Sequence, residues 1–193
     1  MTKIASIDIG SNTVRLLILE SDGNQKFKTL ASRREITRLG EGMDTYGKLM
    51  ESRMSDTFSA LSRFQQDCVD HGNPPLFAVA TSAVREASNG QEFVRQALEK
   101  TGIEIEIISW EEEARLTLEG VFWKIPHENR RILTLDIGGG STEFILSEGK
   151  NIAGCCSSSL GVVRLTEKFI SQHPVDDTEY KNLTTHLKNE LLT

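Results

Sequence analysis

Residues 131–147 read RILTLDIGGGSTEFILS, and this stretch carries the main clue to the fold. An apolar run ends in Asp136, three glycines follow, and a second apolar run begins. A hairpin turn without side chains lets several backbone N–H groups converge on one point, which creates a site for an anion. A carboxylate at the strand end can hold a divalent cation that bridges the oxygens of that anion. The stretch predicts a phosphate-binding hairpin, and a tight hairpin with a capping aspartate is the alternative.

The same pattern occurs near the N-terminus. Residues 7–23 read IDIGSNTVRLLILESDG and residues 135–149 read LDIGGGSTEFILSEG, so Asp136 lies 128 positions after Asp8. Both stretches contain a strand, an aspartate, a turn of small residues and a second strand, which we align with a one-residue slip in the turn. The repetition favours the phosphate interpretation. It also predicts two related half-domains that face each other across a cleft.

Strands and helices alternate along the rest of the chain. Residues 3–9 and 13–21 are predicted strands, and a third strand is expected within 25–39, after the turn signal Asp22-Gly23-Asn24. Further strands are expected over 76–82 and 103–110, and helices over 50–71, 90–102 and 111–125. In the last helix one apolar stripe is predicted, made of Ala114, Leu118, Val121, Phe122 and Ile125.

This alternation is typical of an α/β sheet. The polar, proline-containing segment 126–131 is long enough to be a domain boundary. We therefore expect an N-terminal α/β domain over residues 1–125 and the first part of a second, similar domain over residues 126–193.

Composition narrows the function classes. The chain has 193 residues, 38% of them hydrophobic, and a formal net charge of -6, so it lacks the basic surface expected of a nucleic-acid or membrane-surface binder. Its three cysteines have no disulfide or metal-type spacing, which indicates reduced thiols. No signal peptide or membrane span is predicted, and the cytoplasm is the expected compartment.

Four motifs, in this order, carry a family resemblance: IASIDIGSNTVRLLI, ATSAVREASNG, IISWEEEARLTLEGV and LTLDIGGGSTEFIL. Together they resemble the exopolyphosphatase and guanosine pentaphosphate phosphohydrolase (Ppx/GppA) family of the actin-like ATPase superfamily. The segment SLGVVRLTEKF, residues 159–169, adds a looser likeness. The resemblance implies an α/β actin-like ATPase (RNase H-like) fold, with two similar domains flanking a cleft. Because the family's second domain continues with a further glycine-rich segment, we expect an incomplete second domain here.

The resemblance also implies roles for individual residues. The implied phosphate-binding residues are Ser11, Asn12, Thr13, Arg85, Gly138, Gly139, Gly140 and Ser141. The implied catalytic residues are Glu113 as general base, Asp136, and Arg85 as a contact to substrate phosphate. The implied metal-associated acids are Asp8, Asp136 and Glu143, with Mg²⁺ or another divalent cation as cofactor. These residue types suit phosphoanhydride hydrolysis, which needs charge neutralisation, an aligned water and a base.

Without the resemblance, each residue has a plainer interpretation. The glutamates at 111–113 lie in a predicted first helical turn, where the helix macrodipole favours acids. Arg85 could be an ordinary surface arginine. Glu143 lies on an alternating strand and would face solvent.

The expected function is release of terminal orthophosphate from inorganic polyphosphate, guanosine pentaphosphate or both. The sequence does not separate these substrates, and the second would connect the protein with the stringent response. The first alternative is a noncatalytic nucleotide- or alarmone-binding module, and a sugar or acetate kinase of the same superfamily is a weaker one. We also expect the chain to self-associate as a homodimer.

Overall fold

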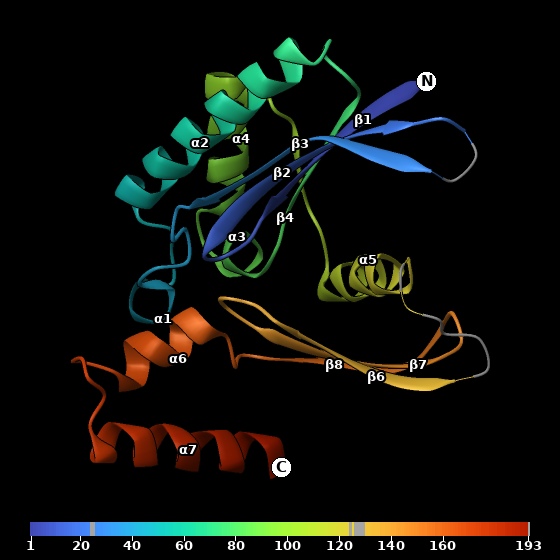
Figure 1. Cartoon of the computed structure of the whole chain (residues 1–193). Helices are drawn as coiled ribbons and strands as arrows, with labels where there is room; N and C mark the ends of the chain where they lie inside the picture. The colour runs from blue at the N-terminus through green and yellow to red at the C-terminus, as the bar shows by residue number, and fades with distance from the viewer. Residues whose placement is uncertain (24–25, 124, 126–129, 193) are drawn as a thin grey trace. The chain divides into compact units, whose positions relative to one another are not determined.

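The first hairpin is the centre of an α/β unit formed by Met1–Glu113. The computed structural model describes the chain except for residues 24–25, 124, 126–129 and 193 (Figure 1). Five strands form one sheet in the order β3-β2-β1-β4-β5. Their bounds are β1 Thr2–Ile9, β2 Thr13–Ser21, β3 Phe27–Ile36, β4 Leu76–Ala80 and β5 Ile105–Ile107. β1, β2 and β3 pair antiparallel, whereas β4 pairs parallel with β1 and with β5.

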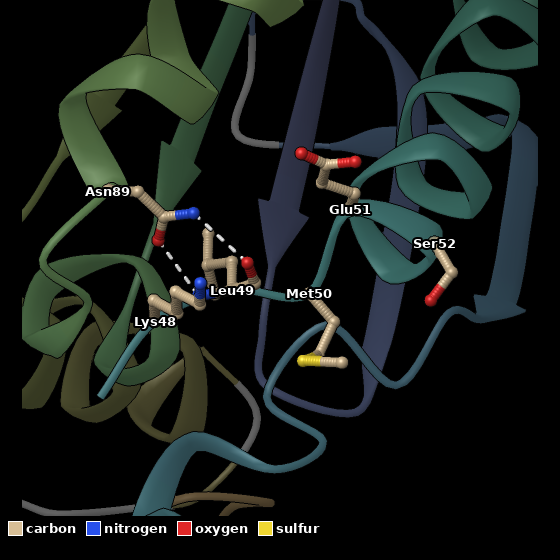
Figure 2. Close-up of a pocket in the computed structure, with 6 residues that line it drawn as sticks. All are labelled: Lys48, Leu49, Met50, Glu51, Ser52 and Asn89. Atoms are coloured by element: carbon tan, nitrogen blue, oxygen red, sulfur yellow. Dashed lines mark hydrogen bonds between the residues drawn. The ribbon is translucent and has the colours of Figure 1, made fainter. Parts of the chain in front are cut away.

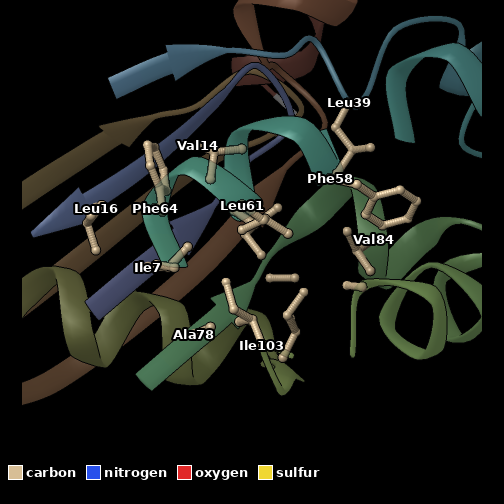
Figure 3. Packing of buried hydrophobic residues seen from close by; sticks show 14 of the residues in the cluster. Ile7, Val14, Leu16, Leu39, Phe58, Leu61, Phe64, Ala78, Val84 and Ile103 are labelled. Atoms are coloured by element: carbon tan, nitrogen blue, oxygen red, sulfur yellow. The ribbon is translucent and has the colours of Figure 1, made fainter. Parts of the chain in front are cut away.

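Helices cover one face of this sheet, where Figure 1 shows α2 and α4 side by side. The helices of the unit are α1 Met43–Tyr46, α2 Glu51–Asp70, α3 Ser82–Glu86 and α4 Gly90–Thr101. Ala5, Ile7 and Ile9 of β1 belong to the buried core that these helices close, in which Phe64 and Phe93 are fully buried. Figure 3 shows Ile7 and Phe64 within this core. Each such large apolar side chain contributes about 1.5–3 kcal/mol through burial.

The second hairpin organises the other unit, Ala114–Thr193. Its sheet has three antiparallel strands in the order β6-β7-β8. The elements are β6 Arg131–Ile137, β7 Thr142–Glu148, β8 Asn151–Ser158, α6 Val162–Phe169, α7 Asp177–Leu192 and most of α5, Trp110–Phe122. Ala114 and Leu118 of α5 pack on Ile145 of β7 and form the small core of this unit.

The hairpins are covered on opposite faces. In the N-terminal unit the face with Ile7 is buried under helices. In the C-terminal unit the equivalent face carries Leu133, Leu135 and Ile137, which are 59%, 51% and 61% exposed, and α5 lies on the other face. The two copies of one motif therefore bury different sides of their sheets.

The predicted elements are largely confirmed, with three corrections. The strand expected over 103–110 shrinks to β5 because Trp110 already begins α5. Ile125 does not continue the buried stripe of that helix but is 49% exposed. Four elements were not predicted: the short helices α1 and α3, strand β8 and helix α6. α1 and α3 are too short to show a helical repeat.

The units divide at Glu113 and Ala114, inside α5, earlier than the predicted boundary at residue 125. The reason is that the side chains of α5 that follow Glu113 pack on the sheet of the C-terminal unit. Much of the predicted joint, 126–129, lies outside the described residues, as does Asn24 of the predicted turn. In the part of the chain that is described, no helix combines the length and apolarity needed to cross a membrane.

Candidate functional site

The turn of the first hairpin is closed by one backbone bond. The N–H of Gly10 donates to the carbonyl oxygen of Thr13 at 3.1 Å, and the strands on either side pair Asp8 with Arg15. Ser11 is buried within this turn. Two of the residues expected to bind phosphate, Ser11 and Asn12, therefore lie between the bonded pair.

The second turn has the same construction. The N–H of Gly138 donates to the carbonyl oxygen of Ser141 at 2.9 Å, and the register pairs Asp136 with Glu143. Both turns therefore hold two residues between the bonded pair. The one-residue slip in the predicted alignment is wrong, because Ser141 is the counterpart of Thr13 without an insertion in either turn.

Close backbone approach explains the glycine that lies against the second turn, Gly161. The glycines with positive φ lie elsewhere in the described chain, so the run at 138–140 does not depend on a left-handed backbone. Gly161 instead packs directly on this run: a Cβ built on Gly161 would lie 2.2 Å from the carbonyl oxygen of Gly139 and 2.2 Å from the carbonyl carbon of Gly140. The second turn and the start of α6 thus contact each other through backbone atoms.

Asp136 and Glu143 form the acidic part of the C-terminal unit. They are opposite each other in an antiparallel pair, so both side chains point to the same face of the sheet. The Thr117 hydroxyl donates to Asp136 Oδ2 at 2.8 Å, and the Ser157 hydroxyl donates to Glu143 Oε1 at 2.8 Å. Glu143 is only 2% exposed, so the interpretation of this residue as solvent-facing is wrong.

These bonds orient both carboxylates and leave Asp136 Oδ1 and Glu143 Oε2 outside them. Magnesium in phosphoryl-transfer sites is held by one or two carboxylates together with waters and phosphate oxygens. The pair fits that requirement. It does not make a site from protein alone, since no cluster of three or more His, Cys, Asp and Glu occurs among the described residues.

Arg85 and Glu113 meet in the N-terminal unit. Arg85 lies on α3, which follows β4, and Thr81 just before α3 donates its N–H to the Ile9 carbonyl oxygen at 3.2 Å. This bond places the start of α3 at the end of β1. Arg85 Nη1 donates to Glu113 Oε2 at 3.1 Å and to the Ile108 carbonyl oxygen at 2.9 Å. The plain interpretation of Arg85 as a surface arginine is therefore replaced by a mostly buried ion pair.

The predicted site residues thus form two groups, one in each unit. The N-terminal unit contains Asp8, Ser11, Asn12, Thr13, Arg85 and Glu113. The C-terminal unit contains Asp136, Gly138, Gly139, Gly140, Ser141 and Glu143. Sequence reasoning missed the hydroxyls of Thr117 and Ser157, which orient the second group. Thr117 could have been found from its spacing, because it follows Ala114 by three residues and therefore lies on the same side of the helix as Ala114 and Leu118.

A separate pocket of about 320 Å³ lies where the chain enters α2, and it contains none of the predicted site residues (Figure 2). Its lining residues are Lys48, Leu49, Met50, Glu51, Ser52 and Asn89. The Asn89 side chain accepts from the Leu49 N–H at 2.8 Å and donates to the Leu49 carbonyl oxygen at 3.0 Å. These two bonds give Asn89 a structural role, which is to fix the segment before α2.

The sheet of the N-terminal unit contains parallel pairs, and its first hairpin is repeated later in the chain. This is the actin-like ATPase fold. Within that class, residues 17–193 match the Ppx/GppA phosphatase family, and the chain belongs to this family.

Relatives agree with this assignment. Exopolyphosphatase 1 of Mycobacterium bovis is 32% identical over 172 residues, which are 89% of this chain and 50% of that protein. The crystal structure of an exopolyphosphatase from Cytophaga hutchinsonii has a TM-score of 0.91 and 31% identity, covering 98% of this chain and 61% of its own. The Aquifex aeolicus Ppx/GppA family member has a TM-score of 0.76 and 34% identity, with the same coverage. The chain therefore spans about half the length of the curated relatives it matches.

Proposed function

We propose that the protein hydrolyses the terminal phosphoanhydride bond of inorganic polyphosphate and releases orthophosphate. The observation that carries this proposal is the oriented Asp136–Glu143 pair beside the Gly138–Ser141 turn. A turn rich in N–H groups next to two carboxylates suits a phosphate with its cation better than it suits a neutral ligand. The names of the relatives, exopolyphosphatases, favour polyphosphate as the substrate.

Each group has a role in this reaction. The backbone N–H groups of the two turns bind phosphate oxygens, and the Arg85 guanidinium neutralises negative charge on the transferred group. Glu113 accepts a proton from water as the water oxygen bonds to the terminal phosphorus and the bridging P–O bond breaks. Asp136 and Glu143 would hold Mg²⁺, which supplies charge neutralisation on the phosphate oxygens.

Guanosine pentaphosphate is the second candidate substrate because it ends in the same phosphoanhydride and because the family name includes it. Its hydrolysis would connect the protein with the stringent response. We also propose that the protein forms a homodimer and that it is located in the cytoplasm.

The deciding experiment is phosphate release by the native gene product, with polyphosphate and guanosine pentaphosphate as parallel substrates and Mg²⁺ titrated in each. Release that requires Mg²⁺ supports the hydrolase, and the ratio of the two rates identifies the preferred substrate. Tight binding of both compounds without release would support the noncatalytic module instead.

A further inference from the structure

In each unit, the segment after the third strand of the sheet donates hydrogen bonds to carbonyl oxygens of the hairpin turn. The third strand is β3 in the N-terminal unit and β8 in the C-terminal unit. After β3, the N–H groups of Thr37 and Arg38 donate to the Asn12 carbonyl oxygen at 3.2 and 3.1 Å, and the N–H of Gly40 donates to the Ser11 carbonyl oxygen at 2.7 Å. The fixed carbonyls are thus those of the two residues at the centre of the first turn.

A related arrangement occurs after β8, but the bonded carbonyls lie one residue earlier in the turn. The N–H of Val162 donates to the Gly138 carbonyl oxygen at 2.9 Å, and those of Val163 and Arg164 donate to the Gly139 carbonyl oxygen at 3.0 and 3.3 Å. The first N–H groups of α6 are therefore bonded to the turn. We call residues 37–40 and 161–164 the two clamp segments.

Each clamp segment makes its contact through a glycine that has no space for a side chain. A Cβ on Gly40 would lie 2.9 Å from Ser11 Cβ and 3.3 Å from the Ser11 carbonyl oxygen. A Cβ on Gly161 would lie 2.2 Å from the Gly139 carbonyl oxygen. Since real Cβ atoms do not approach other atoms this closely, even alanine at either position requires a shift of the turn or of the clamp segment.

The direction of these bonds matters because a trans peptide group points its C=O and its N–H in opposite directions. Fixing the carbonyls of Ser11 and Asn12 towards the clamp segment directs the N–H groups of Asn12 and Thr13 away from it. Fixing the carbonyls of Gly138 and Gly139 directs the N–H groups of Gly139 and Gly140 away in the same manner. These N–H groups are the donors that an anion-binding turn needs.

We propose that the clamp segments position the two turns for phosphate, with Gly40 and Gly161 as the positioning residues. Neither residue touches the ligand. Each lets its segment bind the turn carbonyls closely enough to hold the N–H groups in place before phosphate arrives, so that binding does not have to order them. The hydrogen bonds described above fix the turns, and the role of the turns in phosphate binding rests on the proposed function.

The first test needs no ligand. In ¹H–¹⁵N NMR spectra of the chain, Gly40→Ala should shift the amide signals of residues 10–13, and Gly161→Ala should shift those of residues 138–141. Gly154→Ala is the matched control, because a Cβ on Gly154 meets no atom within 4 Å. Turn signals that move no more in Gly40→Ala than in Gly154→Ala would overturn the clamp. Gly40→Ala has the milder contact of the two, so it keeps the test decisive if Gly161→Ala does not fold.

The second test adds tripolyphosphate as the probe. The wild type should show saturable shifts at the turn amides, and Gly40→Ala should weaken binding by about tenfold, which corresponds to about 1.4 kcal/mol. The Gly154→Ala control should bind like the wild type. Equal affinities in Gly40→Ala and wild type would overturn the positioning role. A wild type whose turns do not respond to tripolyphosphate would overturn the phosphate assignment, while the ligand-free spectra still decide whether the clamp fixes the turns.

Discussion

Arg85 and Glu113 form an ion pair, with Arg85 Nη1 3.1 Å from Glu113 Oε2 and both side chains mostly buried, at 22% and 17% exposed. Arg85, which is expected to bind substrate phosphate, thus donates a hydrogen bond to Glu113, which is expected to act as the base. The Ile108 carbonyl oxygen, 2.9 Å from the same nitrogen, fixes the guanidinium. A phosphate that binds Arg85 would compete with Glu113 for this donor.

The first prediction concerns Glu113→Gln. Glutamine keeps an oxygen that can accept from Arg85 but cannot take a proton from water, so turnover by the native gene product should fall by about 10²–10⁴. Binding of a phosphorylated ligand should change little, because the turns and Arg85 remain. The measurement is kcat for phosphate release beside Kd for a non-hydrolysed analogue.

Glu111→Gln is the matched control, since Glu111 lies in the same helical turn and is exposed. It should retain wild-type turnover. Wild-type turnover in Glu113→Gln would show that the base lies elsewhere, and equal losses of binding and turnover would assign Glu113 a structural role.

The second prediction concerns Asp136→Asn. Asparagine can still accept the Thr117 hydroxyl bond through its side-chain oxygen, so the fold should be kept, but the loss of charge should weaken Mg²⁺ binding. We expect the Mg²⁺ concentration for half-maximal activity to rise about tenfold, the equivalent of about 1.4 kcal/mol. Glu148→Gln, which removes an exposed acid from the same sheet, is the control. An unchanged Mg²⁺ titration in Asp136→Asn would exclude this carboxylate from the metal site.

The third prediction concerns self-association of the 193-residue chain. β6 is an edge strand in the described sheet, and its exposed face carries Leu133, Leu135 and Ile137. An open edge beside apolar surface favours pairing with another chain. Light scattering should therefore show dimers or larger species, and Leu135→Lys should shift them towards monomer. Leu98→Lys, at an exposed leucine of α4, should not. A wild-type chain that is monomeric at all concentrations would contradict the prediction.

The fourth prediction concerns thiol reactivity. Burial raises the pKa of the Cys68 thiol, and the neighbouring Asp67 carboxylate raises it further. Less thiolate is then present at any pH below that raised pKa, and the thiolate is the reactive species. At pH 8 a disulfide reagent should react rapidly with the exposed Cys156 and with Cys68 only after unfolding. Cys156→Ser should remove the rapid phase, whereas three equal rates in the native wild type would contradict this account.

The hairpins were predictable because each follows a local rule. In each hairpin, the strand alternation, the small turn residues and the aspartate lie within about fifteen residues. The structure confirms β1, β2, β6 and β7. Family motifs then selected Arg85 and Glu113, which the structure brings together. Spacing alone could not have paired two residues from different helices.

The burial of Glu143 was not predictable, for a physical reason. Alternation along β7 separates Glu143 and Ile145 from Phe144 and Leu146, but it does not say which set a helix will cover. α5 covers the face with Ile145, and so Glu143 is buried as well. The clamp segments were missed for a related reason, because Gly40 and Gly161 are needed only by contacts with distant parts of the chain.

The opposite covering of the two hairpins has a consequence for how the repeats evolve. Ile7 and Leu135 are equivalent positions, yet Ile7 is 1% exposed and Leu135 is 51% exposed. Within this chain, a substitution at Ile7 changes the packing of the core, whereas a substitution at Leu135 changes an exposed apolar face. A consensus built by superposing the two repeats would average two unrelated constraints, so substitutions accepted in one copy give no guide to the other.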